Sequence, residues 1–119
     1  MSATPVPIPT PRLTLRTYTQ EDATVVQCIG KLSAGGTEIL HDQVKGLIPH
    51  TKRIVLDLTE LTYMDSWGLG TIVGLYVSAK AAGCDLKLVN LSKRIRELLS
   101  ITNLLSVFEI CGEHNMKIP

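Results

Sequence analysis

Hydrophobic residues along this chain follow two kinds of pattern, and the two alternate. Short apolar or alternating runs bounded by polar residues are typical of strands. They occupy residues 13–18, 24–29, 53–58 and 85–90. Apolar residues at steps of three and four are typical of helices that pack on a core. They begin after Ser33, Ser66 and Ser92. The middle helix is predicted to run from about Ser66 to Ala82, because Gly83 then supplies a stop.

The order of these elements predicts the fold class. The first two strands flank the polar segment 19–23 and are predicted to form an antiparallel hairpin. The later strands alternate with helices, which favours parallel pairing through right-handed crossovers. We therefore expect an α/β domain with a mixed sheet of about five strands. The length of 119 residues fits one such domain.

The first residues differ from the rest of the chain. Prolines at positions 5, 7, 9 and 11 alternate with small or apolar residues. Proline is excluded from helix interiors and central strands, and an extended polyproline geometry is typical of such a stretch. We therefore expect a flexible Pro-rich N-terminal segment over residues 1–11 and one folded domain over residues 12–119.

Composition and charge narrow the classes of function. The formal net charge of +1 argues against nucleic acid or an anionic membrane as a direct partner. No apolar run approaches the roughly 18 residues of a membrane span and no signal-peptide pattern is present, so a cytoplasmic location is predicted. Cys28, Cys84 and Cys111 are far apart in apolar surroundings, which favours buried thiols. They show no ligand spacing with the histidines, so we expect no metal and no cofactor.

Residues 63–70, with the sequence Tyr-Met-Asp-Ser-Trp-Gly-Leu-Gly, mark the change from an extended segment to the middle helix. Asp65 or Ser66 is the predicted cap of that helix. The first turn of a helix presents unpaired N–H groups and a partial positive charge, so a hydroxyl there is exposed and oriented. Gly68 and Gly70 each destabilise a helix by roughly 1 kcal/mol relative to alanine. The close approach of another backbone would explain them.

Other interpretations of this stretch follow from the same residues. Capping alone is a common role for an Asp-Ser pair before an apolar helix. A phosphate-binding loop is disfavoured, since the lysine of a Walker motif and the spacing of a dinucleotide fingerprint are both absent. An enzyme is disfavoured as well, because no histidine lies near Ser66 in the sequence to activate its hydroxyl.

The same residues carry a family resemblance. The run 54–58, Ile-Val-Leu-Asp-Leu, followed by residues 63–70 resembles the signature of STAS domains, and of the bacterial anti-sigma factor antagonists in particular. The resemblance spans about residues 13–110. It implies helices mainly on one side of the sheet and a closing strand that ends near Ile110. It also shows Ser33 at a turn where the family usually has aspartate, and we expect Ser33 to cap the helix that follows.

The resemblance implies a function too. In that family the serine after the aspartate is phosphorylated by a partner kinase, and here that serine is Ser66. The unphosphorylated protein binds an anti-sigma factor with serine kinase activity and so releases a sigma factor. A serine phosphatase is the second partner implied. A phosphate at a helix N-terminus is compatible with the fold, whereas a docked partner would meet its bulk and charge. The resemblance thus implies a non-enzymatic binding module that phosphorylation switches off.

Trp67 departs from the family pattern, which usually has serine or threonine at this position. A helical wheel places Trp67, Thr71, Leu75 and Ser78 opposite a predicted core face. That core face comprises Leu69, Ile72, Val73, Tyr76 and Ala79. The predicted partner-binding residues are Asp65, Ser66, Trp67, Gly68, Thr71 and Leu75. In a second interpretation, Trp67 folds back over the core instead of anchoring a partner.

A second class of function stays open beside the phosphoswitch. A STAS module can bind a nucleotide or an anion at the start of the Ser66 helix, or dock into a larger assembly through Trp67. Lys93, Arg94 and Arg96 form a basic cluster at the start of the third predicted helix. Their charge opposes the helix dipole there, which indicates either an acidic partner surface or a solvated face.

Overall fold

The computed structural model describes residues 13–101. Along the chain these residues form β1 (Leu13–Gln20), β2 (Ala23–Leu32), α1 (Thr37–Leu47), the short 3₁₀ helix η1 (Ile48–His50), β3 (Arg53–Asp57), β4 (Leu61–Met64), α2 (Ser66–Ala81), β5 (Asp85–Val89) and α3 (Lys93–Ile101). The predicted Pro-rich segment 1–11, the closing strand near Ile110 and Cys111 lie outside the described residues, and their structure stays a prediction.

The strands form one mixed sheet of five strands. β1 pairs antiparallel with β2 as the predicted hairpin, while β2 pairs parallel with β3, and β3 parallel with β5. The parallel pairs are the ones joined through helices, as the alternation of elements requires. The predicted α/β class with a mixed sheet is therefore confirmed.

One strand of this sheet has no counterpart in the sequence prediction. β4 pairs parallel with the last residues of β2, after a register shift between Gly30 and Lys31. Gly30 has a φ of 106°, which glycine adopts without strain, and its N–H donates to the Glu60 carbonyl at 3.0 Å. β2 thus pairs with β3 along its first part and with β4 along its end. Only the two end residues of β4 are buried, so it lacks the alternation that predicts a strand.

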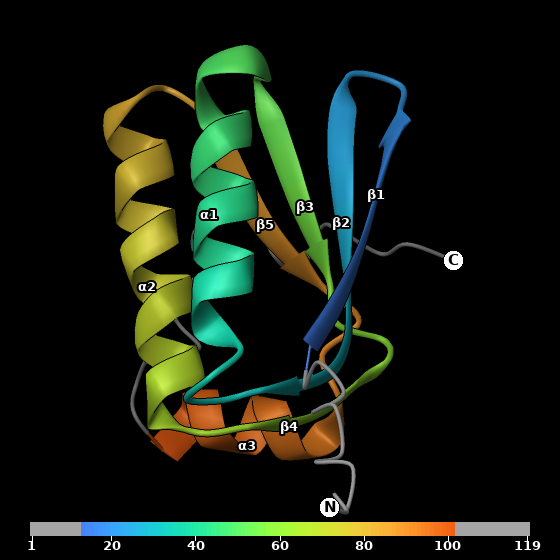
Figure 1. Cartoon of the computed structure of the whole chain (residues 1–119), viewed down its shortest axis with the longest axis vertical. Helices are drawn as coiled ribbons and strands as arrows, with labels where there is room; N and C mark the ends of the chain where they lie inside the picture. Colours follow the sequence, from blue (N-terminus) through green and yellow to red (C-terminus); the bar gives the residue numbers. More distant parts are fainter. Residues whose placement is uncertain (1–12, 102–119) are drawn as a thin grey trace, which may run out of the picture.

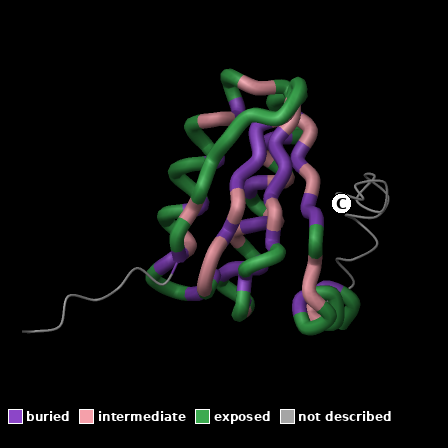
Figure 2. Tube along the Cα trace, turned by 90° about the vertical axis from the view of Figure 1, so that its right-hand side faces the viewer, coloured by how far each residue is buried: buried purple, intermediate pink, exposed green. Residues whose placement is uncertain are grey.

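The helices lie in two places around the sheet. α1 and α2 lie side by side over one face, whereas α3 crosses one end of the sheet, next to β4 (Figure 1). The main core fills the layer between that face and the two long helices, and the inner strands β2 and β3 are mostly buried or half-buried (Figure 2). Its fully buried members include Val26, Leu40, Val44, Leu56 and Ile72. A smaller cluster of Val25, Val55 and Val89 occupies the opposite face.

The start of α1 differs from the prediction. Ser33 was expected to cap this helix, but the helix begins at Thr37 after Gly36, which makes no side-chain cap. The Ser33 carbonyl instead accepts hydrogen bonds from Gly36 N at 2.8 Å and Thr37 N at 3.2 Å. Its hydroxyl is buried and has no partner among the described residues. The added turn, in which Gly35 has a φ of 96°, carries the chain from the sheet to the helix layer.

The chemistry of the core is that of an apolar interior. Cys28 and Cys84 are buried free thiols, which confirms the prediction for these two. Burial, and then the nearby Asp57 charge, raise the pKa of Cys28 to about 12. Within residues 13–101 no cluster of three or more His, Cys, Asp or Glu side chains is placed to hold a metal ion. In the same range no helix is long and apolar enough to cross a membrane.

Candidate functional site

The junction between β4 and α2 presents a serine hydroxyl on the first residue of a helix. Asp65 caps α2, and its Oδ1 accepts a hydrogen bond from Gly68 N at 3.0 Å. The Asp65 carbonyl accepts from Leu69 N at 2.9 Å. Asp65 is therefore the cap of α2, and Ser66 is not. Ser66 is exposed, and within residues 13–101 its hydroxyl forms no hydrogen bond, so that it is available to an incoming group.

The position of this serine is fixed by a close contact at Gly68. Gly68 is buried, and a Cβ built on it would overlap the Leu32 carbonyl oxygen at the end of β2. That Cβ would also lie 2.9 Å from Leu32 Cγ and 3.0 Å from Met64 Cγ. Gly70, in contrast, has no atom within 4 Å of a built Cβ. The predicted close approach of another backbone is confirmed for Gly68, whereas Gly70 lies on the open side of the helix.

The outward face of α2 differs from the predicted one. Leu75 is 1% exposed and Gly68 is buried as well, so neither can touch a partner; this part of the predicted binding set is wrong. Asp65 and Thr71 are half-buried. The exposed residues of α2 are Ser66, Trp67, Gly70, Gly74, Val77, Lys80 and Ala81.

The exposed face of α2 differs from the predicted face because of what surrounds the helix. The helix packs on both the sheet and α1, so its buried arc is wide. Its sequence is apolar on nearly all sides, and a periodicity argument then fails to select one buried face. Trp67 is 69% exposed at the first turn, next to Ser66. The interpretation in which Trp67 covers the core is therefore wrong.

The loop that leads from β3 into β4 is held by Asp57. Its Oδ1 accepts hydrogen bonds from Thr59 Oγ1 at 2.6 Å, Thr59 N at 3.0 Å and Asn90 Nδ2 at 3.1 Å. Burial favours the neutral acid, but the hydrogen bonds from Thr59, Asn90 and Gln27 outweigh it and hold the pKa of Asp57 below its usual value. Asp57 thus ties the middle of β2 and the ends of β3 and β5 to the segment that precedes the site.

This network predicts a pH-dependent contribution to stability. The depressed pKa means that Asp57 stabilises the fold above its ordinary value of 3.8 and loses that contribution as pH falls further. We expect Asp57→Ala to lower the free energy of unfolding by about 1–2 kcal/mol at pH 7, since charge-assisted hydrogen bonds are lost. In urea unfolding at pH 3, the free energies of unfolding of the wild type and Asp57→Ala should differ by less than they do at pH 7. An equal difference at both pH values would contradict this role.

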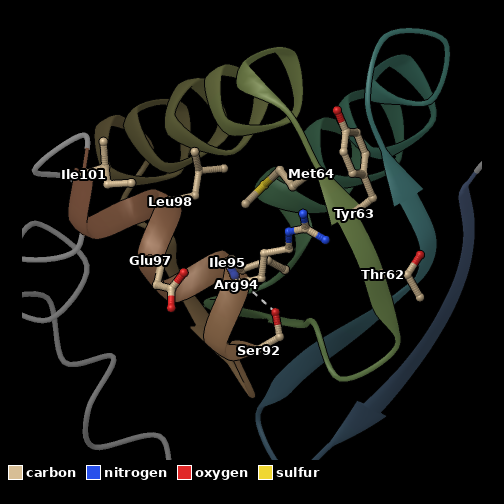
Figure 3. Close-up of a pocket in the computed structure, with 9 residues that line it drawn as sticks. All are labelled: Thr62, Tyr63, Met64, Ser92, Arg94, Ile95, Glu97, Leu98 and Ile101. Atoms are coloured by element: carbon tan, nitrogen blue, oxygen red, sulfur yellow. Dashed lines mark hydrogen bonds between the residues drawn. The ribbon is translucent and has the colours of Figure 1, made fainter.

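A pocket lies between β4 and α3, beside the site. Its volume is about 230 Å³. It is lined by Thr62, Tyr63, Met64, Ser92, Arg94, Ile95, Glu97, Leu98 and Ile101. Ser92 caps α3, since its Oγ accepts from Ile95 N at 3.2 Å. Figure 3 shows the Arg94 guanidinium directed across the pocket toward β4, while the Glu97 carboxylate points away from it. The basic cluster on α3 was predicted from the sequence, but no sequence pattern indicated that β4 would form the opposite wall of the pocket.

Comparison with known proteins assigns the domain. The family model described as "STAS domain" matches residues 14–115. This chain belongs to the STAS domain family. The family resemblance of the sequence is thereby confirmed over nearly the whole chain.

Curated relatives of this STAS domain include anti-sigma factor antagonists. It is 32% identical to the anti-sigma-B factor antagonist of Bacillus subtilis, over 74% of this chain and 81% of that protein. It is 46% identical to the anti-sigma-B factor antagonist of Listeria monocytogenes, over 46% of this chain and 48% of that one.

Solved structures agree on the fold. The Bacillus cell fate determinant SpoIIAA in its phosphorylated form superposes with a TM-score of 0.65 at 19% identity, over 80% of this chain and 87% of that one.

Proposed function

We propose that this STAS domain is an anti-sigma factor antagonist that phosphorylation of Ser66 switches off. The observation that carries the proposal is the exposed Ser66 hydroxyl on the first residue of α2, left free because Asp65 supplies the cap. The names of the two curated relatives support the same function. The domain acts in the cytoplasm by binding rather than by catalysis.

The geometry at Ser66 suits a switch between two binding states. A phosphate there adds roughly 1.5 to 2 negative charges where the dipole and the free N–H groups of α2 favour an anion, so the domain keeps its fold. A partner surface docked over the same point meets that bulk and charge beside Asp65. Like-charge repulsion and desolvation then weaken the complex. The partner is an anti-sigma factor with serine kinase activity, and a serine phosphatase restores the binding form.

A direct test uses the anti-sigma factors with a serine-kinase fold that the source genome encodes. Each is purified and incubated with the full chain and ATP, and the products are mapped by phosphosite mass spectrometry. We expect one of them to bind the unmodified chain and to place a phosphate on Ser66. If none binds, the proposal is wrong. If one binds while Ser66 stays unmodified, the domain is a docking module without a phosphoswitch, which is the alternative that Trp67 raised.

Trp67 is expected to anchor the same complex. Large aromatic side chains exposed at a docking surface often dominate the binding energy. Trp67→Ala should raise the dissociation constant about tenfold, while the melting temperature stays close to that of the wild type because the side chain is 69% exposed. Isothermal titration with the identified anti-sigma factor measures the dissociation constant, and thermal unfolding measures the melting temperature.

Val77→Ala is the matched control for Trp67→Ala. Val77 is 59% exposed on the same face of α2, but it lies almost three turns further along the helix. We expect its replacement to leave the affinity unchanged. A large fall in melting temperature for Trp67→Ala, with unchanged affinity, would show that Trp67 serves stability.

A further inference from the structure

The β4–α3 pocket adjoins the surface that Ser66 controls. Thr62, Tyr63 and Met64 form one wall of the pocket, and the chain passes directly from Met64 into Asp65 and Ser66. Met64 also lies beside Gly68, at the start of α2. A partner that covers the first turn of α2 therefore reaches this pocket as well.

The pocket joins an apolar floor to an unpaired cation. Met64, Ile95, Leu98 and Ile101 supply apolar surface, and Ile101 is 80% exposed. Arg94 forms no ion pair within residues 13–101, and Glu97, one turn away, points away from the pocket (Figure 3). A guanidinium presents a planar set of donors that matches a carboxylate. The preferred occupant thus has an apolar part and an anionic part.

The size of the pocket selects among such occupants. Small-molecule and cofactor sites usually measure about 300–1,000 Å³, and the volume here is about 230 Å³. That space suits an amino-acid side chain better than a nucleotide. Arg94 is exposed and gives this rim of the pocket a positive charge. Charge complementarity then favours an acidic segment of a protein partner.

We propose that the β4–α3 pocket receives an apolar side chain of the anti-sigma factor, with a neighbouring carboxylate of that protein paired to Arg94. This inference rests on the proposed function, because the occupant comes from the same partner. It adds a second point of contact that does not involve Ser66. In such a complex, phosphorylation controls the contact at Ser66, and the contact at the β4–α3 pocket determines which anti-sigma factor binds.

The test compares variants of the full, unphosphorylated chain in titrations with the identified anti-sigma factor. Arg94→Glu should raise the dissociation constant at least tenfold, mainly through faster dissociation. Ile101→Ser should raise it several-fold, and its exposure means that the fold is kept. The matched control is Lys93→Glu, which makes the same change of charge on the adjacent exposed residue outside the pocket lining. It should raise the dissociation constant less than threefold.

The possible results separate this inference from the proposed function. Equal effects of Arg94→Glu and Lys93→Glu, or no effect of Arg94→Glu and Ile101→Ser, would overturn the pocket contact. The Ser66 switch would stand in that case if Ser66→Asp still weakened binding at least thirtyfold. A lower melting temperature of both pocket variants with unchanged affinity would mean that this chain itself fills the pocket, which also overturns the inference. If the wild type binds no anti-sigma factor, both proposals fall.

Discussion

Ser66→Asp is expected to weaken binding of the anti-sigma factor at least thirtyfold, which corresponds to about 2 kcal/mol. The substitution places a carboxylate at an exposed position directly after Asp65, where a docked partner would have to bury it unpaired. The domain should remain folded, since a negative charge is favourable at the first turn of a helix. Isothermal titration with the identified anti-sigma factor measures the affinity, and circular dichroism checks the fold.

Two further variants define what the Ser66→Asp result means. Ser66→Ala removes the phosphate acceptor but adds no charge, so it should bind like the unmodified wild type and take up no phosphate from the kinase. Ser78→Asp makes the same chemical change near the other end of α2. It should leave the affinity within about twofold, because Ser78 lies far from both the first turn of α2 and the β4–α3 pocket at which the partner is proposed to dock. A Ser66→Asp protein that binds as tightly as wild type would remove the switch mechanism.

Gly68→Ala is expected to lower the free energy of unfolding by about 2–3 kcal/mol, as an overpacked core site does. The added methyl group meets the Leu32 carbonyl oxygen, which is backbone and cannot rotate away as a side chain can. Relief of this overlap requires the first turn of α2 to move from the end of β2. Such a movement displaces Ser66, so phosphorylation of this serine should slow as well. Urea unfolding measures the stability, and kinase assays measure the second effect.

Gly70→Ala is the matched control for this prediction. Gly70 lies two residues further along the same helix, and nothing lies within 4 Å of a Cβ built there. Alanine is the better helix former, so this variant should be more stable than wild type by about 0.5–1 kcal/mol. Similar losses of stability in both variants would mean that the approach of Leu32 to Gly68 is not what makes glycine necessary.

Much of the fold follows from local sequence patterns. Alternating and apolar runs located β1, β2, β3 and β5, and three-and-four spacing located the three α-helices, because each of these elements has a face that must be buried. The Asp-Ser pair placed the start of α2 at about Ser66, where the helix begins, but left open whether Asp65 or Ser66 is the cap. These features depend on neighbours in the chain, and so the sequence determines them without knowledge of the tertiary structure.

The site itself was only partly predictable. Ser66 is exposed as predicted, whereas Leu75 belongs to the core. The sequence left open whether Trp67 is an exposed anchor or covers the core, and the structure shows that it is exposed. A helix that is polar on one side shows which face is buried, but α2 carries apolar residues nearly all round. Its orientation is decided by α1 and the sheet, which bury one arc and leave Trp67 and Val77 outside.

The sequence by itself therefore determined the family, the order of the helices and of the strands other than β4, and the position of a serine at the start of a helix. Only the tertiary structure decided that β4 joins the sheet, that Gly68 and not Gly70 requires glycine, and that Arg94 faces β4 across a pocket. Each of these depends on contacts between segments far apart in the chain, such as Leu32 with Gly68. Local patterns indicate which residues are buried, but they do not indicate which distant segments pack against those residues.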